Sequence, residues 1–209
     1  MATFLEMTTT IADMLNRSDL STQIKDEINN AIGYYYEAFR FWFQEKIGTF
    51  ATIASQQAYG TADGTPTDIN EIDYVKIAYA SNWNKELMRV TYQEIENYNI
   101  GNYTGKPEKF AIYQEKFYLW PIPDAAYTVT VAYTQTYSEL SADADTNDFT
   151  NYATELIQYR AISAIYENYL FDNNEADRKR VREIEQLNRL VRKTEKYISS
   201  GQITATSWW

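Results

Sequence analysis

Apolar residues recur at helical spacing at the start of the chain. A short helix is predicted over about residues 8–16, and a long helix over 21–47, where the pattern stops before Gly48. Apolar residues of the long helix stand three, four or seven positions apart: Ile24, Ile28, Ala31, Ile32, Tyr35, Phe39 and Trp42. The second half of this helix is aromatic on nearly every side, so we expect it to be covered on more than one side.

The spacing changes to a period of two in the middle of the chain, over about residues 50–136. The segment from Tyr127 to Tyr133 alternates cleanly between apolar and small or polar residues, which predicts a strand with one buried face. Two hairpins are also predicted, because in each case two apolar segments flank a short polar turn. The paired segments are 73–79 with 86–90, and 109–113 with 117–120. This region is therefore expected to be an antiparallel β region.

Helical spacing returns after residue 148, over about 149–171 and 175–199, and predicts an antiparallel helical hairpin. The second helix has a narrow apolar stripe, formed by Val181, Ile184, Leu187, Leu190 or Val191, and Ile198. An extended tail over 202–209 follows. The sequence thus predicts an α+β fold, with a single domain over 1–201 and a β region inserted between its helices.

The composition removes most catalytic chemistry, because the 209 residues include no His and no Cys. Neither a Ser-His-Asp triad nor a Cys-His pair can form, and zinc sites lack their usual ligands.

The spacing of Asp143, Asp145 and Asn147 resembles the start of a calcium loop, but Asp148 stands where glycine is needed, and capping of the next helix by Asn147 or Asp148 is favoured. We predict a protein that is not an enzyme and that has no cofactor. No segment has the pattern of a signal peptide or a membrane span.

Charge is distributed unevenly along the chain. The net charge is −10, which disfavours tight binding to nucleic acid, yet residues 174–200 carry eight Lys or Arg against five Asp or Glu. The basic run Arg178, Lys179, Arg180 and Arg182 is a candidate docking face. The alternative, a solvated helix face, is the commoner meaning of such a run.

Aromatic residues are unusually frequent, with 19 Tyr, 9 Phe and 5 Trp. Tyr and Trp offer a large apolar area with a polar group, so they are enriched at surfaces that become buried on assembly. The aromatic helix half and the tail are therefore the predicted interface with a partner or a neighbouring copy, through Tyr35, Phe39, Trp42, Ile203, Trp208 and Trp209.

Two stretches carry a resemblance to a known family: residues 105–112, Gly-Lys-Pro-Glu-Lys-Phe-Ala-Ile, and residues 117–133, in which Trp120-Pro-Ile-Pro-Asp-Ala-Ala-Tyr127 is distinctive. Together with the order of the surrounding helices and loops, they resemble the head–tail adaptor proteins of tailed phages, especially short-tailed ones. The resemblance covers most of residues 5–198. Lys106-Pro107 departs from the Thr-Pro or Ser-Pro that is commoner there.

The resemblance implies a virion protein of the phage neck, made in the host cytoplasm, that forms a ring, commonly of twelve copies. Its partners would be the portal protein, tail or nozzle proteins and other copies of itself, with DNA passing through the ring without specific binding. Two alternatives remain open at this point. Exposed Tyr and Trp beside Asp also suit a glycan-binding module, and the carboxylates leave room for a cell-wall hydrolase.

Overall fold

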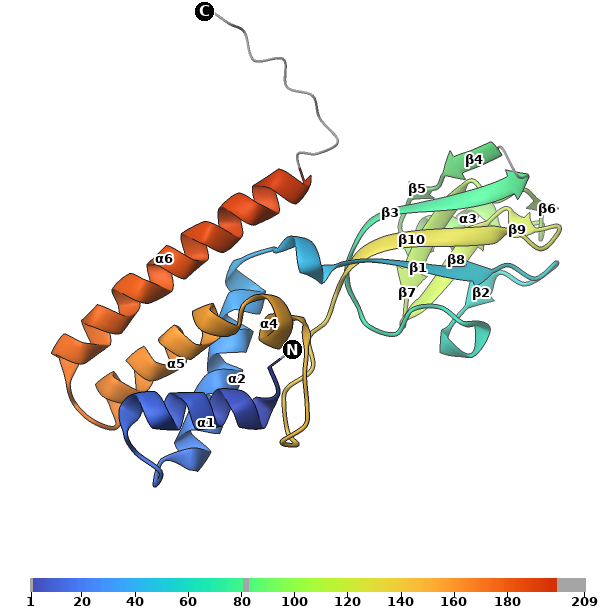
Figure 1. Ribbon diagram of the computed structural model, residues 1–209. Coiled ribbons are helices and arrows are strands. Elements are labelled where there is room, and N and C mark those ends of the chain that lie inside the picture. The colour runs from blue at the N-terminus through green and yellow to red at the C-terminus, as the bar shows by residue number, and fades with distance from the viewer. Residues whose placement is uncertain (1, 81–82, 199–209) are drawn as a thin grey trace, which may run out of the picture. The chain divides into compact units, whose positions relative to one another are not determined.

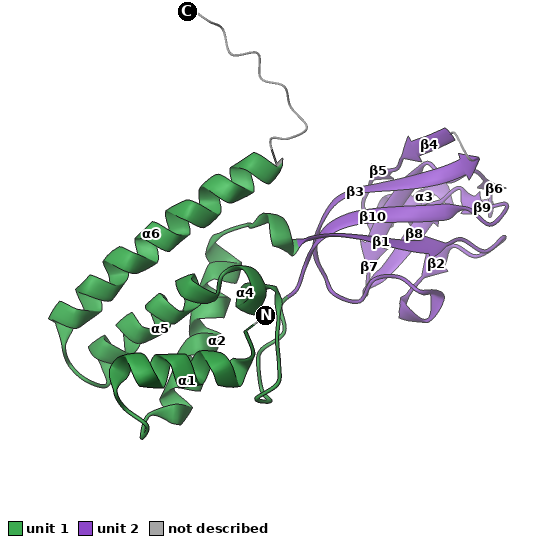
Figure 2. Ribbon diagram, in the orientation of Figure 1, with its two compact units in different colours: residues 1–44, 137–209 green, residues 45–136 purple. Residues whose placement is uncertain are grey.

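The computed structural model describes residues 2–80 and 83–198, which form two compact units (Figures 1 and 2). The first unit contains the residues up to 44 and from 137 onward, and its regular elements are helices. The second unit contains residues 45–136 and holds the strands. The α+β class is confirmed, while the single domain expected from the sequence is divided into two units, each with its own hydrophobic core.

The helical unit is built around α5. Its elements are α1 (Phe4–Leu15), α2 (Ser21–Ala38), the 3₁₀ turn η1 (Trp42–Gln44), α4 (Asp148–Tyr152), α5 (Thr154–Asn168) and α6 (Asn173–Ile198). Helix α5 packs against α6 on one side and against α2 and α1 on the other (Figure 1). The core between them contains Ile11, Ile28, Ile32, Leu156, Ile162 and Ile165, which are all fully buried.

The helix predicted over 21–47 ends at Ala38, so its last part was wrong. Phe39 is already extended, with φ −140° and ψ 144°, and Phe41 and Phe43 are buried in the core next to it. The chain then enters strand β1 (Glu45–Ala51), which pairs with β10 (Thr128–Gln135) along its whole length. Tertiary pairing with a strand distant in sequence thus overrides the local helical spacing.

The helices near the end of the described chain were predicted more closely. The segment expected as one helix over 149–171 is two helices, α4 and α5, separated by a break at Ala153. The expected partner helix over 175–199 is α6. The loop before α6 is short, so α5 and α6 form the predicted helical hairpin.

The β unit contains two four-stranded sheets that enclose one core. The first sheet has the order β1-β10-β3-β4 and is antiparallel; the second has the order β2-β8-β7-β5. The additional elements are β2 (Ala58–Tyr59), η2 (Thr61–Asp63), β3 (Ile69–Ala80), β4 (Trp83–Glu86), β5 (Met88–Arg89), α3 (Tyr92–Tyr98), β6 (Thr104–Gly105), β7 (Lys109–Tyr113), β8 (Lys116–Trp120) and β9 (Ile122–Pro123). Strands β6 and β9 form a small parallel pair.

The alternation predicted around β10 holds over its first half and is lost at Ala132, where the pairing register shifts and both faces are buried. Val129 and Val131 are fully buried and face Phe117 and Leu119 of the second sheet within the same core cluster. The predicted β7–β8 hairpin turns at Gln114 and Glu115, which both have positive φ, as the tight two-residue hairpin turn requires. Alternation and turn chemistry therefore account for the β unit.

Candidate assembly surface

Helix α6 presents apolar side chains on its outer face. Val181 is 58% exposed and Ile184 is 56% exposed. The sequence predicted that both face the partner helix α5, and this was wrong. The buried positions of α6 are Ala176, Glu183, Leu190 and Thr194, a stripe that contains two polar side chains. The apolar pair on the outer face is thus left without a partner among the described residues of its own subunit.

A buried polar cluster determines which face of α6 points inward. One carboxylate oxygen of Glu183 accepts two hydrogen bonds. The first comes from the Tyr35 hydroxyl of α2, and the second comes from the Arg160 guanidinium of α5, with 2.9 Å between nitrogen and oxygen. The Arg160 guanidinium also stacks on the Tyr34 ring, with 3.5 Å between its central carbon and the ring centroid. Because a buried carboxylate without partners is costly, Glu183 must remain on this side of the helix.

Tyr35 is therefore a core residue rather than an interface residue. Its side chain is 1% exposed, and burial, followed by the hydrogen bond to Glu183, raises the pKa of its hydroxyl well above the ordinary value. The neutral phenol remains a donor to Glu183 at any physiological pH. The expectation that Tyr35 contacts a portal or a neighbour is corrected on this ground.

The basic run on α6 is largely paired within its own subunit. Exposed ion pairs join Arg178 to Glu175, Arg182 to Glu185, and Arg180 to both Glu167 and Asp177, while Lys179 is half-buried. Exposed pairs of this kind contribute little stability, but they reduce the free positive charge of the run. Further along α6, Arg189, Arg192 and Lys196 have no ion pair with any described residue.

Trp42 and Phe39 lie at the edge of the helical core, half-buried. The Trp42 ring stacks on the Tyr197 ring of α6, with 5.3 Å between the ring centroids, and meets the Tyr152 ring of α4 edge-on, with 5.8 Å between centroids. The Lys193 ammonium lies 4.5 Å from the Trp42 ring centroid. Tyr152 and Tyr197 are both more than half exposed. Unlike Tyr35, Trp42 belongs to a cluster whose outer members are open to contact.

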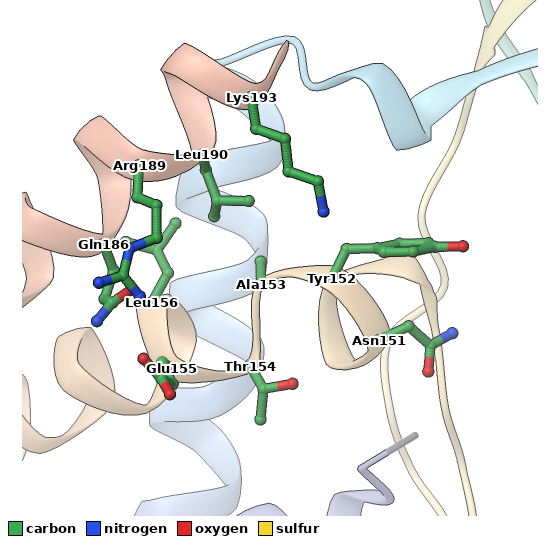
Figure 3. Close-up of a pocket in the computed structure, with 10 residues that line it drawn as sticks. All are labelled: Asn151, Tyr152, Ala153, Thr154, Glu155, Leu156, Gln186, Arg189, Leu190 and Lys193. Atoms are coloured by element: carbon green, nitrogen blue, oxygen red, sulfur yellow. The ribbon is translucent and has the colours of Figure 1, made fainter. Parts of the chain in front are cut away.

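A groove of about 310 Å³ lies beside this aromatic cluster, between the start of α5 and α6. Figure 3 shows Arg189 and Lys193 extending from α6 across it, toward Glu155 and Tyr152. The residues that line the groove include two cations, one carboxylate, amides and apolar groups. A hydrolase that uses two carboxylates, one as acid and one as base, would need a second carboxylate here. The groove therefore places two cations against one carboxylate beside exposed aromatic rings.

The loop with calcium-like spacing uses its side chains for structure. Asp145 accepts hydrogen bonds from the backbone N–H groups of Ser141 and Ala142, which hold the pKa of its carboxyl below the ordinary value. Asp143 pairs with Lys25 at 2.6 Å. The predicted capping by Asn147 is confirmed, because its side chain accepts from the Thr150 N–H at the start of α4. Within residues 2–80 and 83–198, no cluster of three or more possible metal ligands occurs.

Lysines lie over several of the exposed aromatic rings of the β unit. The Lys109 ammonium lies 3.8 Å from the Tyr98 ring centroid and 5.2 Å from that of Trp120. The Lys106 ammonium lies 4.6 Å from the Trp83 ring. A sugar would stack on such ring faces, so at these rings the lysines occupy the place that a bound sugar would need.

The remaining predicted contact residues, Ile203, Trp208 and Trp209, lie outside the described residues. No helix within the described chain is long and apolar enough to cross a membrane.

Comparison with known families decides the class of this protein. The model of the SU10 adaptor protein family matches residues 2–204, nearly the whole chain. The chain belongs to the SU10 adaptor protein family. As a member, it is a phage adaptor protein, a structural component of the head–tail region that associates with other head and tail proteins. None of the curated proteins matches it.

Membership in the SU10 adaptor family agrees with the resemblance drawn from residues 105–112 and 117–133. The family also implies a non-enzymatic protein. The features that stand out in this adaptor are accordingly surfaces: the outer face of α6 and the aromatic cluster around Trp42.

The Glu183 cluster yields a stability prediction. Glu183→Ala removes the acceptor of both Tyr35 and Arg160, and we expect it to lower the free energy of unfolding of the helical unit by about 2 kcal/mol. This is below the usual cost of breaking a buried pair, because Arg160 is about one-third exposed. Urea unfolding followed by far-UV circular dichroism measures the change.

Glu185→Ala is the matched control on the same helix. Its exposed pair with Arg182 should contribute less than about 0.5 kcal/mol. Equal losses in the two variants would show that Glu183 does not anchor α6.

Proposed function

We propose that this adaptor forms a ring of about twelve copies between the portal and the tail of a short-tailed phage, and that the ring surrounds the DNA exit channel. The observation that carries the proposal is the outer face of α6. It exposes Val181 and Ile184 in the middle of a long helix, where a monomer would be expected to place polar residues.

Side-by-side packing of helical units would cover these side chains. A ring subunit meets a neighbour on each of two unlike faces, and such contacts bury apolar residues at their centre with charged residues around them. The outer face of α6 has this composition, since charged or polar residues stand three or four positions from the apolar pair: Asp177, Arg178, Glu185 and Asn188.

The overall charge fits a channel through which DNA moves. A net charge of −10 repels the phosphate backbone, so a lumen that reflects this charge would let DNA slide rather than hold it. The pairing of Arg178, Arg180 and Arg182 with carboxylates further limits their use as phosphate contacts.

Ring formation can be tested with Val181→Asp/Ile184→Asp. Both residues are outside the core, so the variant should fold, while charge at the centre of the interface should prevent rings when the protein is mixed with the cognate portal. Val181→Ala/Ile184→Ala keeps the helix propensity and should weaken each contact by about 2 kcal/mol, roughly thirtyfold in affinity. Sedimentation velocity and negative-stain imaging measure the rings.

Ile53→Asp is the matched control, because Ile53 is 52% exposed but lies in the β unit. It should assemble as the wild type does. Rings of normal abundance from the double aspartate variant would refute the role of the α6 outer face.

We also propose that Ile203, Trp208 and Trp209 anchor the adaptor to the portal or to a neighbouring copy. Support comes from the sequence, because paired Trp residues are typical binding hot spots. Deleting residues 202–209 should leave the unfolding midpoint unchanged and weaken portal attachment by about a thousandfold, if each Trp contributes about 2 kcal/mol. Surface plasmon resonance on immobilised portal measures the attachment.

A variant that changes the same segment but keeps its apolar residues, Gln202→Ala/Thr204→Ala/Thr206→Ala, should attach normally. If the deletion attaches as tightly as the wild type, the anchor does not exist.

A further inference from the structure

The helical unit has two outer faces on opposite sides of α5. One is the outer face of α6, and the other is the outer face of α1, which packs on α2 and α5 (Figure 1). A subunit with two unlike outer faces can meet one neighbour through each of them. Whether these two faces fit each other can be judged from their charge and their apolar side chains.

The charges of the two faces are opposite. Residues 173–198, which form α6, carry eight Lys or Arg and five Asp or Glu. On α1 the charged residues are Glu6 and Asp13, which are both acidic and exposed. Unlike charges across an interface guide association and determine which surfaces meet.

The exposed charges form stripes along each helix. Arg182, Arg189 and Lys196 follow one another at intervals of seven residues, so they lie along one side of α6. Ile184 is two positions from Arg182 and therefore points to a different side of the exposed face. Glu6 and Asp13 are also seven residues apart and are exposed on the outer side of α1. Each stripe is thus a linear feature with the same repeat, which suits packing of two helices side by side.

Each charged stripe has exposed apolar neighbours. On α1, Leu5, 48% exposed, and Met14, 45% exposed, flank the acidic stripe on opposite sides, because they are nine positions apart, and on α6 the exposed apolar pair is Val181 and Ile184. Contact between the two faces would cover apolar surface on both helices and pair basic with acidic side chains around it.

We propose that the outer face of α6 in one copy packs against the outer face of α1 in the next copy. This contact is head-to-tail, so it repeats from copy to copy and closes into a ring if the rotation allows. Packing of α6 on α6 in a two-fold dimer is disfavoured, because it would bring two basic stripes together. The inference rests on the proposed ring and identifies the surface that receives α6.

Charge reversal on each face tests the contact. The first variant, Arg189→Glu/Lys196→Glu, makes the α6 stripe acidic, and neither residue has an ion pair within the described part of its own subunit. The second, Thr9→Lys/Asp13→Lys, makes the exposed stripe of α1 basic and leaves the capping residue Glu6 unchanged. Each variant alone should form at least about tenfold fewer rings on the cognate portal than the wild type, because like charges then meet at every contact.

An equimolar mixture of the two variants should restore ring formation. In a ring where the two variants alternate, the acidic α6 of the first variant meets the basic α1 of the second. At the next contact, the unchanged basic α6 of the second variant meets the unchanged acidic α1 of the first. Arg89→Glu/Lys116→Glu is the control. It replaces two exposed basic residues of the β unit, changes the net charge by the same amount as the α6 variant and should assemble normally.

The outcomes separate this inference from the function on which it rests. Normal rings from either variant alone, or a mixture of folded variants that stays unassembled, would overturn the α6–α1 contact while wild-type rings still support the function. If wild-type protein forms no ring on the portal, both proposals fail.

Discussion

The hydrogen bonds of Glu183 to Tyr35 and Arg160 determine how α6 is presented. Three helices, α2, α5 and α6, each contribute one side chain to this cluster, and Glu183 is only 8% exposed. Because a buried carboxylate cannot turn outward without leaving its two partners unsatisfied, the helix is held in one rotation about its axis. Val181 and Ile184 are exposed as a direct consequence. The face that we propose for assembly is therefore presented by a polar interaction in the core.

The absence of His and Cys and the large number of aromatic residues have a common explanation in a protein that functions through contacts. The carboxylates with an evident role in the described chain cap helices, support turns or pair with basic side chains, as Asp145, Asp143 and Glu175 do. In the β unit, Lys106 lies over the exposed Trp83 ring and Lys109 over the exposed Tyr98 ring. These features agree with the structural role that the adaptor family implies.

Local patterns predicted the β unit well and α6 only in part. The alternation at the start of β10 and the β7–β8 turn both depend on neighbouring residues, so the sequence reveals them. The end of α2 depends on the pairing of β1 with β10, about 85 residues away in sequence, which no local pattern carries. The rotation of α6 was missed because Glu rarely occupies a buried position, and its two partners lie on other helices. Spacing alone therefore assigned Val181 and Ile184 to the core.

The central claim is that the outer face of α6 becomes buried when the adaptor assembles. The chain has no cysteine, so Val181→Cys introduces a single thiol whose reaction with a maleimide reports the exposure of this face. The account predicts rapid labelling of the free subunit and strong protection in the portal-bound assembly, while Ile53→Cys in the β unit reacts in both states. Equal labelling of Val181→Cys before and after assembly would contradict the account.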